Sequence, residues 1–144
     1  MLWTLIPAKN FTQSKGRLAG LLSEAERAAL SAALLSRTVQ IASRAFPGHP
    51  VVVVATDHEV ADAALSAGAS RAITPRAQGL NPQLAEAAAQ LPAGDDLLVL
   101  HADLPLLMTA DLTTLAATPG PVVIAPDHRG EGTNALLLRA AHRF

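Results

Sequence analysis

The chain has 144 residues, of which half are hydrophobic but only 3% are aromatic, and it contains no cysteine. This length predicts one domain, residues 1–144, with a core of alanine, valine, leucine and isoleucine. The 11 basic and 12 acidic residues leave a net charge of −1. This balance excludes an overall field for nucleic acid or an anionic membrane, and the lack of cysteine excludes disulfides and thiolate metal sites.

The N-terminal segment does not have the pattern of a secretion signal, because its basic residues follow the first apolar stretch instead of preceding it. No apolar run approaches the length that crosses a bilayer. We therefore expect a cytoplasmic protein that has neither a membrane nor a nucleic acid as its partner.

Five apolar segments predict β-strands, at residues 2–7, 51–57, 71–75, 96–103 and 121–127. Several are apolar at nearly every position, which is typical of strands buried on both faces of a parallel sheet. Helical periodicity lies between them, at residues 23–46, 58–69, 82–91 and 109–117. Ser23 and Thr109 are the predicted N-caps of the first and fourth helices. The apolar segment 135–138 predicts one more strand.

The alternation of strands and helices predicts an α/β fold, a doubly wound and mostly parallel sheet with helices on both faces. Ligands of such sheets bind outside the carboxyl ends of the strands. We therefore expect the functional residues in the loops that follow the strands, at residues 7–20, 55–59, 74–81, 101–107 and 125–134.

The first of these loops contains Lys9, Lys15 and Arg17. Three cations on one loop could hold a triphosphate, arginine through paired hydrogen bonds and lysine as a point charge. A solvated basic loop without a ligand is the alternative. The loop has neither the P-loop pattern nor the glycine fingerprint of dinucleotide-binding proteins, which argues against an NAD-dependent dehydrogenase.

Asp103 follows the fourth predicted strand and precedes the rigid Leu104-Pro105 step. A carboxylate at this position is a candidate ligand for Mg²⁺, which usually takes one or two carboxylates and completes its shell with phosphate and water. A cap or turn aspartate is the alternative. His101 should share a strand face with Asp103, and we interpret it as structural because Mg²⁺ prefers oxygen.

The remaining loops permit two interpretations each. Gly79 would let the backbone approach a flat base, with Gln78 or Asn81 as a hydrogen-bonding partner, or it forms a turn in which Asn81 caps the third helix. Asp57 is either a site residue or the cap of the second helix. Gly132, Thr133 and Asn134 form a pocket for a phosphate or carboxylate, or belong to a plain hairpin.

Taken together, the motifs resemble one family. The segments IPAKNFTQSKGRLAGLLSEAERAAL, VVVVATD, GLN, HADLPLL and IAPDHRGEGTNALLL are similar, in this order, to the 2-phospho-L-lactate guanylyltransferase family of deazaflavin coenzyme F-420 biosynthesis. The resemblance covers essentially the whole chain. It implies a Rossmann-like nucleotidyltransferase fold of the GT-A type.

The resemblance also implies a role for each loop. Lys9, Lys15 and Arg17 would hold the phosphates of GTP, and Asp103 would bind Mg²⁺, with these four residues forming the catalytic group. Thr133, flanked by Gly132 and Asn134, would contact the phosphorylated acid substrate. The nucleotide-binding positions implied in this way are Pro7, Ala8, Lys9, Arg17, Thr56, Gly79, Leu80 and Asn81.

The implied reaction transfers GMP from GTP to the phosphate of 2-phospholactate, phosphoenolpyruvate or 3-phosphoglycerate, and the sequence does not choose among the three. The acceptor phosphate has a second pKa of about 6, so it is an anion at neutral pH and needs no general base. A nucleotidyltransferase acting on a molybdopterin or a sugar phosphate is the alternative within enzymes. The alanine- and leucine-rich first helix could support a homodimer.

One departure from the family pattern concerns the C-terminus. Family members continue into a glycine- and serine-containing segment that helps to hold the acceptor phosphate, whereas this sequence ends at Phe144. We therefore expect a chain that lacks the C-terminal segment. The alternative function from another class is a nucleotide-binding module without transfer activity.

Overall fold

The computed structural model describes residues 1–142, so Phe144, at which the sequence predicts an early end, lies outside the described residues. Within this range the strands form one six-stranded sheet in the order β3-β2-β1-β4-β6-β5. Their bounds are β1 (Leu2–Ala8), β2 (Val51–Ala55), β3 (Arg71–Ile73), β4 (Asp96–Leu100), β5 (Val122–Pro126) and β6 (Thr133–Leu138). Strands β1 to β4 are parallel, and β6 runs antiparallel to β4 and β5. The predicted mostly parallel sheet is confirmed.

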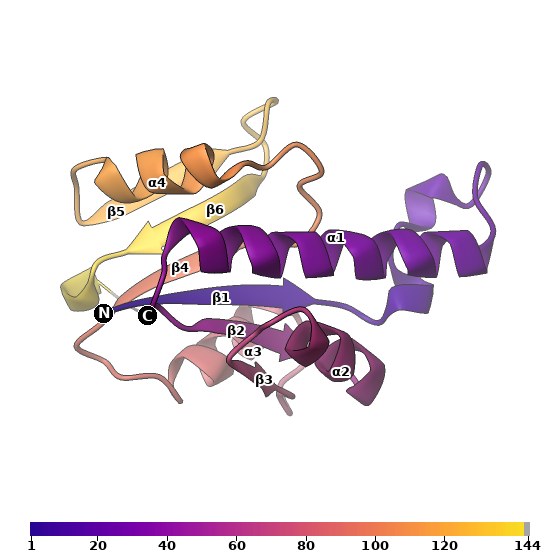
Figure 1. Cartoon of the computed structure of the whole chain (residues 1–144), viewed down its shortest axis with the longest axis horizontal. Helices are drawn as coiled ribbons and strands as arrows, with labels where there is room; N and C mark the ends of the chain where they lie inside the picture. The colour runs from indigo at the N-terminus through magenta and orange to yellow at the C-terminus, as the bar shows by residue number, and fades with distance from the viewer. Residues whose placement is uncertain (143–144) are drawn as a thin grey trace.

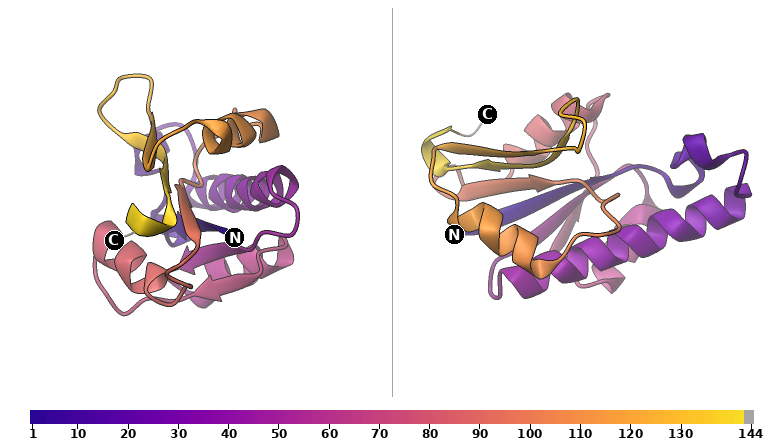
Figure 2. Two further views of the ribbon diagram at one scale, coloured as in Figure 1. Left: turned by 90° about the vertical axis from the view of Figure 1, so that its left-hand side faces the viewer. Right: turned by 90° about the horizontal axis from the view of Figure 1, so that it is seen from above.

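Helices cover both faces of this sheet, as the alternating sequence predicts. Their bounds are α1 (Glu24–Ala45), α2 (His58–Ser66), α3 (Leu80–Ala88) and α4 (Thr109–Ala117). Helices α1, α2 and α4 lie on one face, while α3 lies on the other (Figures 1 and 2). None of the described helices is long and apolar enough to cross a membrane.

The two faces of the sheet explain why the strand sequences are apolar at successive positions. In β4, Leu98 and Leu100 belong to the cluster formed with α1, α2 and α4. Their neighbours Leu97 and Val99 point to the opposite face and join the cluster that contains Leu84 of α3. Both faces therefore bury apolar side chains, and a polar residue in these strands would lose its hydration.

Two of the four N-cap candidates in the sequence cap their helices. Ser23 caps α1, and its hydroxyl and Glu26 form a reciprocal capping box. Asp57 caps α2 by accepting a hydrogen bond from the Val60 N–H at 3.0 Å. The prediction that Thr109 caps α4 was wrong, because the helix begins at Thr109 itself. There the Asp111 carboxylate accepts the Met108 N–H at 2.8 Å.

The interpretation in which Asn81 caps the third helix was wrong, because that helix begins before Asn81. Asn81 is not its cap, because α3 begins one residue earlier, at Leu80, and the N-cap position is Gly79. Gly79 has no side chain with which to cap, and its φ of 87° lies in the region that favours glycine. The Asn81 side chain is therefore left exposed in the first turn.

Strands β2 to β5 end earlier than the apolar pattern predicts, whereas β1 ends one residue later, at Ala8, and the earlier ends place polar residues in loops. Strand β4 ends at Leu100, which pairs with Ala135 of β6, whereas its pairing with β1 ends one residue earlier, at Val99. His101 and Asp103 therefore follow the strand, and the expectation that they share a strand face was wrong. Thr56 and Asp57 likewise follow β2, which ends at Ala55.

Candidate functional site

The five loops predicted to carry function lie along one edge of the sheet. Strands β1 to β4 are parallel, so their carboxyl ends face the same direction, and β5 shares that direction because both it and β4 are antiparallel to β6 (Figure 1). Strand β6 begins at this edge. The topology therefore brings the segments after β1, β2, β3, β4 and β5 to the place where ligands of such sheets bind.

The loop after β1, residues 9–18, is called the cationic loop below, and its first half is held by local hydrogen bonds. Asn10 accepts hydrogen bonds from the Thr12 N–H at 2.9 Å and from the Thr12 hydroxyl, and the Ser14 hydroxyl donates to the Asn10 carbonyl at 2.8 Å. Phe11 is 3% exposed and packs into the core beside α1. Its burial fixes the loop against the body of the protein.

The three cations of this loop differ in their surroundings. Lys9 and Arg17 are exposed, whereas Lys15 is largely covered, with 22% of its side chain accessible. Lys15 has a φ of 58°, in the left-handed region that non-glycine residues rarely adopt. Its Nζ lies 3.6 Å from Oδ2 of Asp103, on the loop after β4. The fold thus joins two predicted site residues from separate loops.

Asp103 has the properties expected of a carboxylate that binds a metal ion together with groups of the substrate. Its side chain is 61% exposed, and among the described residues Lys15 is its charged partner. No cluster of three or more histidine or acidic side chains suited to a metal lies within the described part of the chain. This donor set fits Mg²⁺, since that ion is often held by one carboxylate together with the phosphates of a substrate.

The loop between β5 and β6 is organised by Asp127. Its Oδ1 accepts the N–H groups of Arg129 and Glu131, both at 3.0 Å, and its own N–H donates to the Gly132 carbonyl at 2.8 Å. A Cβ on Gly132 would lie 3.0 Å from the Asp127 Oδ2, so glycine suits this close approach. The segment forms a β-hairpin, which is one of its two interpretations, and the Thr133 side chain is exposed at the start of β6.

The same hairpin reaches the loop that carries Asp103. The His101 N–H donates to the Asn134 carbonyl at 3.1 Å, which extends the β4–β6 pairing by one residue. The Asn134 side-chain amide reaches the Pro126 carbonyl at 3.5 Å. Gly132, Thr133 and Asn134 therefore stand next to the Asp103 loop.

Asp127 gives a testable pH dependence. The hydrogen bond from the Glu131 N–H has the largest effect and lowers the pKa of Asp127. Desolvation comes second and opposes it, but the N–H groups of Gly132, Arg129 and Gly130 add to the lowering, so the pKa lies below its usual value. A lowered pKa means that the carboxylate stabilises the loop above its unfolded pKa of about 3.9, and that this stabilisation is lost as the pH falls through the folded value.

We expect the side-chain carboxyl ¹³C resonance of Asp127 to stay fixed down to about pH 4 and to move only below it. An NMR titration measures this, and Asp127→Asn should remove the acid transition. A transition centred above the unfolded pKa in the unsubstituted protein would contradict the assignment of Asp127 as the organiser of the hairpin.

Side chains of α3 hold the loop after β3 in place through hydrogen bonds. The Glu86 carboxylate accepts the Arg76 N–H at 3.0 Å and the Ala77 N–H at 2.8 Å, and these bonds lower the pKa of Glu86. The Gln83 amide donates to the Ala77 carbonyl at 3.2 Å. Gly79, Leu80 and Asn81 follow directly and are exposed. They stand at the outer end of the edge, since β2 lies between β3 and β1.

Gly79→Ala is expected to destabilise the protein by about 1–3 kcal/mol, because φ 87° with ψ 154° is a backbone conformation that essentially only glycine adopts. The cost is conformational, since the nearest atom to an added Cβ, Pro82 Cδ, lies at an ordinary 3.8 Å. Urea unfolding measures the change. Gly94→Ala is the matched control, because an added Cβ there meets nothing within 4 Å. Equal effects of the two substitutions would contradict the strain at Gly79.

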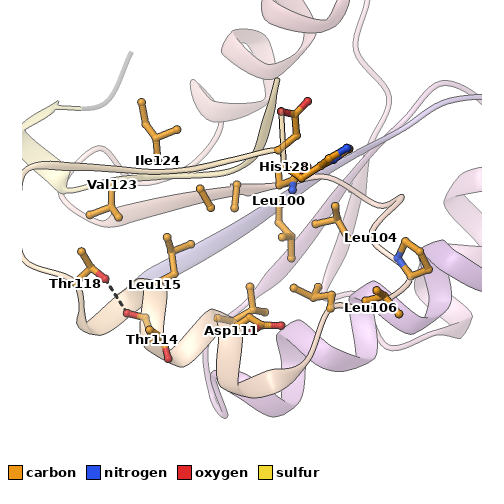
Figure 3. Close-up of a pocket in the computed structure, with 17 residues that line it drawn as sticks. Leu100, Leu104, Leu106, Asp111, Thr114, Leu115, Thr118, Val123, Ile124 and His128 are labelled. Atoms are coloured by element: carbon orange, nitrogen blue, oxygen red, sulfur yellow. Dashed lines mark hydrogen bonds between the residues drawn. The ribbon is translucent and has the colours of Figure 1, made fainter. Parts of the chain in front are cut away.

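A cavity of about 810 Å³ lies beside this edge, between α4 and the β5–β6 hairpin. Leu100, Leu104, Leu115 and Val123 contribute to its apolar wall, and His128 stands at its rim (Figure 3). Arg37 of α1 supports the loop that forms one wall by donating to the Leu107 carbonyl at 2.7 Å. The side chains that line the cavity are mostly apolar, so the cavity suits an apolar group and not an anion.

The structure places the other predicted residues at the ends of the central strands. Pro7 and Ala8 are the last residues of β1, and Ala8 is buried. Thr56 is exposed directly after β2. The organising roles of Asn10, Glu86 and Asp127 were not predicted from the sequence, and neither was the cavity. For Asn10, the Asn-x-Thr spacing of an Asx-turn was a usable signal.

The fold is that of nucleotidyltransferases and nucleotide-sugar transferases. A crystal structure of a putative nucleotide-diphospho-sugar transferase from Desulfovibrio desulfuricans matches with a TM-score of 0.71 and 16% identity, over 99% of this chain and 65% of that one. CMP:2-keto-3-deoxy-manno-octonic acid synthetase complexed with CTP matches with a TM-score of 0.61 and 15% identity, over 97% of this chain and 74% of that one.

Within this class, the chain belongs to the family described as "Guanylyl transferase CofC like", whose model matches residues 2–144. The phosphoenolpyruvate guanylyltransferase of Nocardia farcinica is 43% identical over 144 residues, covering 94% of this chain and 63% of the relative. That of Roseiflexus sp. is 38% identical, covering 96% and 62%. The chain thus spans less than two thirds of the length of these two relatives. The resemblance predicted from the sequence motifs is confirmed.

Proposed function

We propose that the protein is a guanylyltransferase that transfers GMP from GTP to the phosphate of a small phosphorylated acid and releases diphosphate. One observation carries the proposal: in a chain of this family, Lys15 and Asp103 approach to 3.6 Å at the carboxyl edge of the sheet. A cation and a candidate metal ligand are thus combined where two anionic substrates would have to meet.

The positions of the loops support a division of roles along this edge. Lys9, Lys15 and Arg17 bind the triphosphate. Pro7, Ala8, Thr56 and the backbone at Gly79, Leu80 and Asn81 border the nucleoside, because these residues lie at the ends of β1, β2 and β3. Gly132, Thr133 and Asn134 bind the acceptor, since they stand on the other side of the Asp103 loop.

The proposed chemistry balances without a protein nucleophile. An oxygen of the acceptor phosphate forms a bond to the α-phosphorus of GTP while the bond from that phosphorus to the bridging oxygen breaks, and diphosphate leaves with the electron pair. At neutral pH the acceptor phosphate is largely ionised, because its second pKa is about 6. The protein therefore needs to supply alignment and charge neutralisation.

The cationic loop and Asp103 provide this neutralisation. Lys9, Lys15 and Arg17 offset the repulsion between the two substrates and the charge that develops on diphosphate. Mg²⁺, held by Asp103 and phosphate oxygens, would add positive charge at the α-phosphorus. Lys15 lies 3.6 Å from Asp103, so the lysine and the proposed metal ligand would act on the same phosphates.

Phosphoenolpyruvate is the acceptor that we propose first, because the relatives from Nocardia farcinica and Roseiflexus sp. are named phosphoenolpyruvate guanylyltransferases. 2-Phospholactate and 3-phosphoglycerate are the alternatives, and each has the same phosphate and carboxylate groups. Guanylylation of such an acid would place the protein in coenzyme F-420 biosynthesis, as the family resemblance implies.

The test is diphosphate release by the purified protein with GTP, Mg²⁺ and each of the three acids in turn, with ³¹P NMR to identify the new phosphate–phosphate linkage. Release with one acid, dependent on Mg²⁺, would support the proposal and identify the acceptor. GTP binding without release in any mixture would instead favour a nucleotide-binding module. Release with a molybdopterin or sugar phosphate alone would favour a related nucleotidyltransferase.

The homodimer expected from the first helix stays a prediction. Among the described residues of α1, Leu30 is the exposed large hydrophobic side chain, at 36%. The helix directs Leu35, Val39 and Ile41 into the core, which accounts for much of its apolar content. Light scattering of the purified protein measures its oligomeric state.

A further inference from the structure

We propose that Asn10 and Asp57 form a positioning pair that holds the cationic loop in the conformation that receives the nucleotide phosphates. This inference rests on the proposed function, because it assigns a cause to the order of the loop that would bind GTP. Neither residue is proposed to touch the substrate. Their effect would be transmitted through Lys9 and Lys15.

The pair joins two loops that are distant in the sequence. The Asn10 Nδ2 donates to the Asp57 Oδ2 at 2.5 Å, in a partly buried position. Asn10 directly follows Lys9 and lies five positions before Lys15 along the cationic loop. The bond therefore ties the beginning of this loop to the start of α2, which packs on the sheet.

Both partners are themselves held in place. The second oxygen of Asp57 caps α2 by accepting the Val60 N–H at 3.0 Å. The Asn10 oxygen accepts the Thr12 N–H at 2.9 Å. A continuous series of hydrogen bonds thus runs from α2 to the first turn of the cationic loop. A loop ordered before its ligand arrives loses less conformational entropy on binding.

The charges of the pair favour positioning over direct binding. Asp57 is an acid beside a cationic loop, yet the hydrogen bonds described for its carboxylate come from an amide and a backbone N–H, which are neutral donors. Lys15 is paired with Asp103 instead. An uncharged partner at position 10 therefore satisfies Asp57 without engaging a lysine or arginine that the phosphates need.

A swap of the two side chains tests the pair. In Asn10→Asp, two carboxylates face each other. In Asp57→Asn, two amides meet, and neither can turn without losing its bond to Thr12 or Val60. The double variant Asn10→Asp with Asp57→Asn restores every bond with the polarity reversed, because the carboxylate at position 10 accepts from Thr12 and from the amide at position 57. The net charge is also unchanged.

Three readouts separate positioning from general stability. Trypsin cleavage under native conditions at Lys9, Lys15 and Arg17 reports opening of the loop. Calorimetry with GTP and Mg²⁺ gives the nucleotide affinity, and steady-state rates divide the effect between KM for GTP and kcat. Thermal unfolding detects a global loss of stability. Gln40→Ala, an exposed amide on α1, is the control for removal of an amide.

We expect each single variant to raise the loop cleavage rate and to weaken GTP binding by roughly tenfold, the range for a lost hydrogen bond to a charged group. KM for GTP should rise more than kcat falls, and the double variant should recover most of the loop protection. Two outcomes would overturn the proposal. One is single variants whose loop cleavage rate and GTP affinity stay within about twofold of the unsubstituted protein. The other is a double variant in which the losses of the two single variants simply add.

The two hypotheses can fail separately. If the unsubstituted protein binds no GTP, the proposed function is contradicted, and the trypsin comparison still decides whether the pair orders the loop. If the unsubstituted protein releases diphosphate but the variants bind GTP and resist trypsin as it does, the function stands and the positioning pair is rejected.

Discussion

Asp103→Asn is expected to reduce GMP transfer by roughly 10³-fold, the upper range for removing one preorganised electrostatic group from an active site. The substitution keeps the size of the side chain and removes the charge that is proposed to hold Mg²⁺. It also removes the partner of Lys15, but the Asp103 side chain is 61% exposed, so this ion pair adds at most about 1 kcal/mol to stability. The loss should therefore appear in the rate of diphosphate release at nearly unchanged thermal stability.

The matched control for Asp103 is Asp62→Asn, which removes one negative charge from the exposed face of α2. It should leave transfer unchanged. A second check varies Mg²⁺, because loss of a metal ligand should raise the metal concentration needed for half-maximal rate. Full activity of Asp103→Asn at low Mg²⁺ would refute the metal role and leave Asp103 as a partner of Lys15 alone.

Lys15→Met is expected to lower kcat/KM by roughly 10²-fold, since a cation lost at the transferring phosphate is a loss of transition-state stabilisation. Methionine keeps the length of the stem, which is largely covered, and keeps the strained backbone at φ 58°. The free energy of unfolding measured in urea should therefore change by less than about 1 kcal/mol. Steady-state kinetics with varied GTP measures the effect.

Two further variants sharpen this prediction. Lys15→Arg keeps the charge and should retain more activity than Lys15→Met, although its planar group will not reproduce the lysine point charge. The double variant Lys15→Met with Asp103→Asn should lose less than the product of the single losses, because the two side chains approach each other in one site. Multiplicative losses would show that the two residues act independently.

The order of strands and helices was readable from the sequence because burial imposes it. The run of four valines in β2 is buried on both faces, and a segment apolar at every position is stable only there. The ends of the strands were less predictable. Residues 101–103 continue the apolar pattern of β4 only in part, and β4 ends at Leu100, where its pairing with both neighbouring strands stops.

The candidate site was predicted as a set of loops but not as a set of contacts. The rule that ligands bind at the carboxyl edge of a parallel sheet placed Lys15, Asp103 and Thr133 in one region. Lys15 approaches Asp103 from a left-handed backbone conformation, which no local pattern of a lysine predicts. The tie between Asn10 and Asp57 depends likewise on the adjacency of β1 and β2.

The sequence by itself determined the fold class, the family and the edge of the sheet at which to look for a ligand. Periodicity and motif order carry this information because hydrophobic burial acts on every residue of a strand or helix. The tertiary structure alone decided which side chains meet, as for Asn134 beside His101 and Glu86 beneath the Arg76 loop. Such contacts join residues distant in the chain, and they depend on strand order and loop conformation, which composition and spacing do not encode.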